Sequence, residues 1–276
     1  HCKTRRQRQM CIRDRITGAV IGFIFAVNTE IPIYGFICAA IAGALLSVLF
    51  AVLTQYIMSN QVATGLGLTM VGLGLSALIG KPYEGIRSPT LSKIEIPILS
   101  DIPILGPMIF SHDAIVYFSI ILVGTVAFVI SKTRVGLVLR AVGENQEAAH
   151  ALGYKVVRIR FLAIMFGGAT AGIGGAYISL ARVPQWTEGM TAGAGWIALA
   201  LVVFASWKPW RVLLGAYLFG GITVLQLNLQ AIGVAIPVEI LSMSPYLVTI
   251  VVLVGISLFG HHTAPGSLAR PFHASQ

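Results

Sequence analysis

The chain has 276 residues, of which 56% are hydrophobic and 11% are charged, and its mean hydropathy is +0.85. A soluble domain of this length does not need so many apolar side chains to fill its core. The composition therefore disfavours a soluble protein and indicates an integral membrane protein that crosses a bilayer several times.

The formal net charge of +9 is unevenly placed, because the first fifteen residues contribute +5 of it through six Lys or Arg side chains and one Asp. The remaining excess is mild, so no nucleic-acid partner is expected. The three cysteines, Cys2, Cys11 and Cys38, have neither the spacing of a disulfide framework nor that of a metal site. No cofactor or metal is expected in this chain.

Residues 1–15, HCKTRRQRQMCIRDR, lack a starting Met, helical periodicity and the apolar core of a signal peptide. We interpret this segment as a non-native head. The first apolar run, Ile16–Val27, has only twelve residues, whereas a transmembrane helix needs about 20. It predicts a partial span and suggests that the native helix begins further upstream.

Further apolar runs predict an all-α, polytopic membrane domain over residues 16–260, with about seven transmembrane helices after the partial span. The runs are Ile33–Tyr56, Val62–Ile79, Ala114–Ile130, Ile159–Leu180, Ala194–Ser206, Val212–Leu229 and Pro245–Phe259. The run at 194–206 is short, which is typical of a broken or re-entrant helix. Gly168 and Gly172 stand one turn apart, a spacing that allows close helix packing.

The loop 131–160 holds six Lys or Arg residues, and cytoplasmic loops retain positive charge. Placing this loop in the cytoplasm puts the loop 80–113 outside and the tail 261–276 inside. The outer loop contains IPILSDIPILGP, residues 96–107, whose prolines forbid a regular helix. Its alternating Ile and Leu residues predict an ordered cap.

The basic loop also contains a candidate docking helix. Asn145 can cap a short helix, Glu147 follows in its first turn, and Gly153 stands where a left-handed C-terminal cap is wanted. The enclosed residues are mostly Ala, so the helix could lie deep in a groove on another protein. A solvated connector helix explains the same pattern, and the residues alone leave both interpretations open.

The segment EAAHALG, Glu147–Gly153, resembles the EAA-xxx-G signature of the permease subunits of ABC importers. The match extends over most of Gly18–Phe259 and is similar to the sugar and branched-chain amino-acid type. NQVATGLGLTMVGLGLSALIG and EGMTAGAGWIALALVVFASWKPW look most like its nucleoside or simple-sugar branch. The Leu-Pro pair of the older signature is absent, as are a further span and a Gly-rich stretch that the family has ahead of Ile16.

The resemblance implies a transport subunit of the bacterial cytoplasmic membrane rather than an enzyme. Its partners would be a cytosolic ABC ATPase, a second permease that makes a heterodimer, and an extracytoplasmic substrate-binding lipoprotein. No GxxxxGK[ST] phosphate loop occurs in the sequence, so ATP hydrolysis is expected in another chain. The resemblance assigns the ATPase coupling to Gly143, Glu144, Asn145, Glu147, Ala148, Ala149 and Gly153.

Polar residues inside the predicted spans are candidates for a substrate path, although hydrogen bonding between helices is the usual explanation for them. Gln226 and Gln230 share a helix face with Thr223 near them, and their amide and hydroxyl groups suit the ribose or base edges of a nucleoside. Gln61 and Thr64 form a second polar set.

Other functions stay open at this point. A branched-chain amino-acid or pentose permease is the main alternative within the class. An ion-coupled carrier is disfavoured, because no predicted span has a charged residue at its centre. A membrane scaffold that transports nothing is the third alternative.

Overall fold

The computed structural model describes residues 5–89, 91, 93–95, 111–191, 197–198, 201–202, 204–205, 208–233, 237, 240, 243–244, 246–248, 250–251 and 254–255. Apart from one two-stranded antiparallel sheet, the regular elements in these ranges are helical. They are α1 (Arg5–Thr29), α2 (Pro32–Gln55), α3 (Gln61–Gly80), η1 (Lys81–Tyr83), β1 (Lys93–Glu95), β2 (Ser111–Asp113), α4 (Ala114–Lys132), α5 (Arg134–Glu144), α6 (Gln146–Ala151), α7 (Val156–Tyr177), η3 (Ile178–Arg182) and α9 (Pro209–Ala231).

The all-α, polytopic fold is confirmed, because five of these helices are long and apolar enough to cross a membrane. They are Pro32–Gln55, Gln61–Tyr83, Ala114–Lys132, Val156–Arg182 and Pro209–Ala231. Each matches a predicted run. The two other runs, Ala194–Ser206 and Pro245–Phe259, and the tail 261–276 lie largely or wholly outside the described residues, so the total of seven stays a prediction.

The N-terminal helix includes most of residues 1–15. α1 begins at Arg5, although this segment has no helical periodicity. Packing against α2 stabilises α1 at Asp14. The Asp14 side chain is 1% exposed, and its carboxylate accepts a hydrogen bond of 2.6 Å from the Ser47 hydroxyl of α2. A charged residue therefore does lie between helices. Whether the head is foreign stays a prediction.

Small residues hold α1, α2 and α7 together as the core of the bundle. A Cβ atom at Gly18 would overlap the backbone of Gly172, and one at Gly43 would overlap the carbonyl of Gly168. These three helices therefore touch through their backbones, as the spacing of Gly168 and Gly172 predicts. Phe23 is fully buried in the apolar cluster that they enclose.

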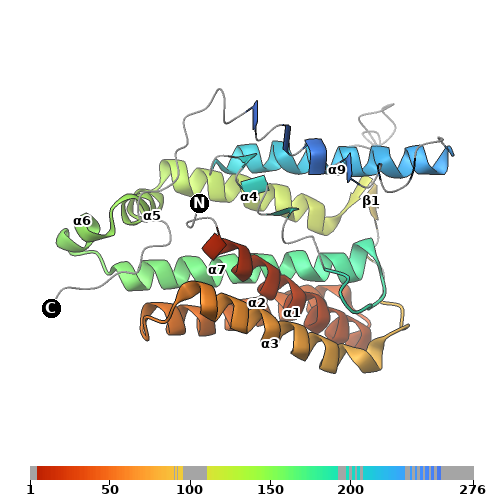
Figure 1. Cartoon of the computed structure of the whole chain (residues 1–276), viewed down its shortest axis with the longest axis horizontal. Coiled ribbons are helices and arrows are strands. Elements are labelled where there is room, and N and C mark those ends of the chain that lie inside the picture. The colour runs from red at the N-terminus through yellow and green to blue at the C-terminus, as the bar shows by residue number, and fades with distance from the viewer. Residues whose placement is uncertain are drawn as a thin grey trace.

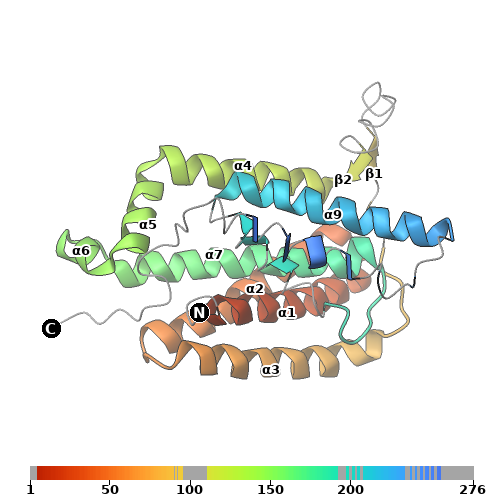
Figure 2. The same ribbon diagram turned by 45° about the horizontal axis from the view of Figure 1, so that its top comes forward.

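The helices form two layers. α1, α2, α3 and α7 lie on one side, and α4 and α9 pair with each other on the other side (Figure 1). Figure 2 shows α5 and α6 at one end of the bundle, together with the turn between α2 and α3, whereas β1 and β2 lie at the opposite end. The basic loop and the described flanks of the loop 80–113 thus lie at opposite ends of the bundle, and which end is cytoplasmic stays a prediction.

At the end of the bundle opposite α6, the loop after η3 packs against the end of α3 and the loop that follows it. Trp186 is 2% exposed, and its indole occupies the place that a Cβ at Gly80 would take. The Ser88 amide donates to the carbonyl of Pro184 (3.1 Å), and the Asn28 amide donates to the Tyr83 hydroxyl (3.2 Å). The flanks of the outer loop are therefore ordered, while the predicted cap at 96–107 lies outside the described residues.

Candidate functional site

The basic loop forms a helical hairpin made of α5, α6 and the turn that follows. Asn145 caps α6, because its side-chain oxygen accepts hydrogen bonds from the backbone amides of Glu147 (3.1 Å) and Ala148 (3.0 Å). Gly153 has a φ of +86°, the left-handed conformation that favours glycine after a helix. The predicted cap and helix end are both confirmed. We call α5, α6 and residues 152–155 the hairpin.

One side of α6 is fixed against its neighbours. Ala149 is 2% exposed and packs in an apolar cluster with Val142 of α5 and Val156 of α7. A guanidinium nitrogen of Arg160 donates to the buried Gln146 side-chain oxygen at 2.8 Å. The hairpin is thereby held rigidly on the end of α7.

The seven residues assigned to ATPase coupling differ in their exposure. Glu144, Asn145, Glu147, Ala148 and Gly153 are exposed, and Gly143 is half-buried. Ala149 is buried inside the hairpin, where its small side chain packs with Val142 of α5 and Val156 of α7. The part of all seven residues in ATPase coupling stays a prediction.

Two exposed residues of the hairpin were not predicted. The side chains of Leu152 and Tyr154 are 76% and 41% exposed on either side of Gly153. Large apolar side chains exposed outside the membrane commonly mark a contact surface. The signal in the sequence was an apolar residue on each side of a turn glycine in an otherwise polar loop.

We expect Asn145→Ala to destabilise α6 by about 1 kcal/mol, since it removes the acceptor of two backbone amides. Hydrogen exchange at the Glu147 and Ala148 amides should become faster, because α6 opens more often when it is less stable. Asn145→Asp is the matched control, because Asp is an equally good cap. Equal exchange in the Ala and Asp variants would contradict the capping role.

A cavity of about 390 Å³ lies between the two layers of the bundle. Its described walls come from α4, η3, α7, α9, one residue of α1, and Ile197, Ala198 and Leu201. Most of them are apolar. The polar groups are the hydroxyls of Ser119, Thr170 and Tyr177 and the guanidinium groups of Arg15 and Arg182.

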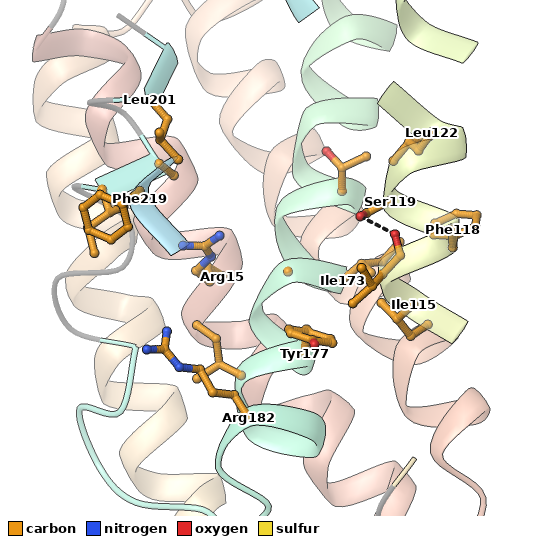
Figure 3. A pocket seen from close by; sticks show the side chains of 16 residues that line it. Arg15, Ile115, Phe118, Ser119, Leu122, Ile173, Tyr177, Arg182, Leu201 and Phe219 are labelled. Carbon is orange, nitrogen blue, oxygen red and sulfur yellow. Dashed lines mark hydrogen bonds between the residues drawn. The ribbon is translucent and has the colours of Figure 1, made fainter. Parts of the chain in front are cut away.

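Figure 3 shows the two arginines on one side of this cavity, Ser119 on α4 opposite them, and Tyr177 between. The Tyr177 hydroxyl donates to the carboxylate of Asp113 at 3.5 Å, and the Ser119 hydroxyl donates to the carbonyl of Val116 at 2.7 Å. Aromatic rings of Phe118 and Phe219 complete the wall. The cavity thus combines ring faces with a few hydroxyl groups, which suits a small amphipathic ligand.

The predicted path residues lie elsewhere. Thr223, Gln226 and Gln230 are half-buried on α9, and Gln61 and Thr64 are half-buried at the start of α3. None of them is among the described lining residues of the cavity. Their role in a path stays a prediction. The cavity-lining hydroxyl groups of α4 and α7 were not predicted from the sequence, because each stands alone in an apolar run.

Comparison with known proteins identifies the family. Residues 15–256 match the model of the branched-chain amino acid transport system / permease component family. TsgC13 of Haloferax volcanii, named as a putative glucose ABC transporter permease protein, is 36% identical over 86% of this chain and 79% of its own length. No solved structure matches.

Two further relatives are named for nucleosides. The nucleoside ABC transporter permease protein NupC of Lactococcus lactis is 33% identical over 86% of this chain and 78% of its own length. The guanosine ABC transporter permease protein NupQ of Bacillus subtilis is 33% identical over 87% of this chain and 77% of its own length. The chain belongs to the branched-chain amino acid transport system / permease component family and is a membrane-spanning ABC transporter permease.

Proposed function

We propose that this permease imports a nucleoside or a simple sugar, using ATP hydrolysed by a separate cytosolic subunit. The observation that carries the proposal is the position of the motif: Glu147–Gly153 lies on a rigid hairpin that extends from one end of the helical bundle (Figure 2). An ATPase bound there could move α7, because Ala149 and Gln146 tie the hairpin to that helix.

The contact with the ATPase would use the exposed residues of the hairpin. Glu147 and Ala148 present a charge and a small side chain, and Leu152 adds an apolar one. An anchoring apolar side chain surrounded by polar groups is the usual composition of such an interface. The substrate would be delivered at the opposite end of the bundle by an extracytoplasmic binding lipoprotein.

A second permease subunit would cover part of the outer surface of the bundle. The most apolar stretches of α4 and α9 are each only 6% buried within the described chain. The corresponding stretch of α2 is 39% buried. The layer formed by α4 and α9 is therefore free to meet lipid or another subunit. A related but different permease would make the heterodimer that the resemblance implies.

The bundle cavity is the candidate substrate path. The rings of Phe118, Phe219 and Tyr177 offer faces for a nucleobase or a sugar ring, and the hydroxyls of Ser119 and Thr170 lie on the same walls. No part in binding a neutral substrate is assigned to the guanidinium groups of Arg15 and Arg182. A neutral substrate agrees with walls that are mostly apolar.

Filling this cavity should slow transport more than altering the polar face of α9. We expect Ile173→Trp to lower uptake about 10-fold, because the indole would occupy the cavity that Ile173 lines. The Gln226→Leu/Gln230→Leu double variant should have a smaller effect. Ile121→Trp is the control, since Ile121 is 66% exposed on α4. A greater loss for the double variant would favour α9 as the path.

The substrate class is tested by uptake into cells that express the permease with its partner subunits. Labelled guanosine, labelled glucose and labelled leucine are supplied separately, and unlabelled leucine and ribose are added as competitors of the first two. The proposal predicts saturable uptake of guanosine or glucose that leucine does not reduce. Uptake of leucine alone would assign the chain to the amino-acid branch instead.

A further inference from the structure

A second hollow lies between α4, α7 and the α5 helix of the hairpin. Its volume is about 780 Å³, which is within the range of ligand sites. Leu122 is the one described residue that lines both this hollow and the bundle cavity. We call the second hollow the inner groove. Its walls include Val126 and Val129 of α4, Val138 and Leu139 of α5, and Leu162 and Phe166 of α7.

The inner groove is apolar except at its end. Of its described lining residues only Thr125 and Arg134 are polar, and the Thr125 hydroxyl donates to the carbonyl of Ile121 at 2.8 Å. Arg134 is the first residue of α5 and is exposed. The groove therefore combines a long apolar wall with one guanidinium group at the level where the bundle ends.

The elbow between α4 and α5 keeps this arrangement in place. The Thr133 hydroxyl accepts a hydrogen bond from the Gly136 amide at 3.2 Å, and a Cβ at Gly136 would overlap the carbonyl of Val129. α5 therefore folds back tightly onto the end of α4. Lys132 at the end of α4 and Arg140 on α5 are exposed as well, so several positive charges stand at this end of the bundle.

We propose that the inner groove binds an anionic phospholipid of the cytoplasmic leaflet, with an acyl chain along the groove and the phosphate at Arg134. The inference rests on the proposed orientation, in which the hairpin end is cytoplasmic. Basic groups at the cytoplasmic ends of membrane helices attract anionic headgroups, and guanidinium groups hydrogen-bond phosphate in a fork geometry. An apolar helix from another subunit would match the apolar walls of the groove but not the positive charge of Arg134.

The test is native mass spectrometry of the full chain, purified with its partner subunits after equilibration with equal amounts of palmitoyl-oleoyl phosphatidylglycerol and phosphatidylcholine. The wild-type chain should retain the phosphatidylglycerol in preference to the neutral lipid. Arg134→Gln should lower that retention about fivefold. Arg211→Gln, which removes an exposed arginine of α9 outside the groove, should leave it unchanged.

A second pair of variants tests the apolar part of the site. Val138→Trp would fill the groove and should also displace the lipid, whereas Leu137→Trp, at a side chain that is 61% exposed on the same helix, should not. Equal loss with Arg211→Gln, equal retention of both lipids, or unchanged retention in Arg134→Gln would overturn the proposal. Lipid retention is measured without transport. A negative result would therefore contradict the lipid proposal without contradicting the proposed ATP-driven uptake.

Discussion

Glu147→Arg should abolish coupled transport while leaving membrane insertion intact. Glu147 is exposed in the first turn of α6, where a negative charge favours the helix and a positive charge opposes its dipole. The substitution also places a long cation in the centre of the proposed ATPase contact. Reversing a charge at an interface commonly costs several kcal/mol, so we expect uptake to fall at least about 100-fold.

The decisive readout for this variant is the ratio of uptake to ATP hydrolysis in reconstituted vesicles. Loss of substrate-stimulated ATPase activity, with normal amounts of inserted chain, is the expected result. Glu147→Gln keeps the length of the side chain and removes only its charge, so it should retain much of the uptake. If Glu147→Arg vesicles take up substrate at the wild-type rate, the hairpin does not carry the coupling.

Gly172→Ala should strongly destabilise the bundle, although it adds only one methyl group. A Cβ at this position of α7 would overlap the carbonyl of Ala39 in α2 and contact Gly43 at 3.4 Å, and Gly18 of α1 lies against the same residue. These are backbone atoms that cannot rotate away. We expect a loss at the upper end of the about 1–3 kcal/mol that overpacking costs.

Thermal unfolding in detergent measures this effect, with the amount of inserted chain as a second readout. Gly124→Ala is the matched control, because an added Cβ on that residue of α4 meets no described atom within 4 Å, and Ala favours a helix by up to about 1 kcal/mol. The control should be neutral or stabilising. Equal melting temperatures for the two variants would show that α1, α2 and α7 do not meet through Gly172.

Sequence reasoning succeeded where the cause is local. Five spans were predicted because each is a continuous apolar run, and the cap by Asn145 and the left-handed Gly153 depend only on residues within a few positions of them. The family resemblance rested on the Glu147–Gly153 motif together with a match over most of Gly18–Phe259. These features do not require knowledge of which helices are neighbours.

Features that depend on tertiary packing were missed. The helix α1 is stabilised at Asp14 by the contact with Ser47, thirty-three residues away. The burial of Ala149 depends on where α5 and α7 lie. The cavity brings Ser119 of α4 beside Tyr177 of α7, and a lone hydroxyl in an apolar run gives no sign of such a neighbour.

The central claim is that this permease works with an ATPase that docks on the hairpin. The most direct measurement is uptake into vesicles that contain the assembled transporter and are loaded either with ATP and Mg²⁺ or with ADP and Mg²⁺, each with and without an ionophore. The account predicts uptake only with ATP inside, unaffected by the ionophore. Uptake that proceeds with ADP and stops when the ionophore is added would contradict it.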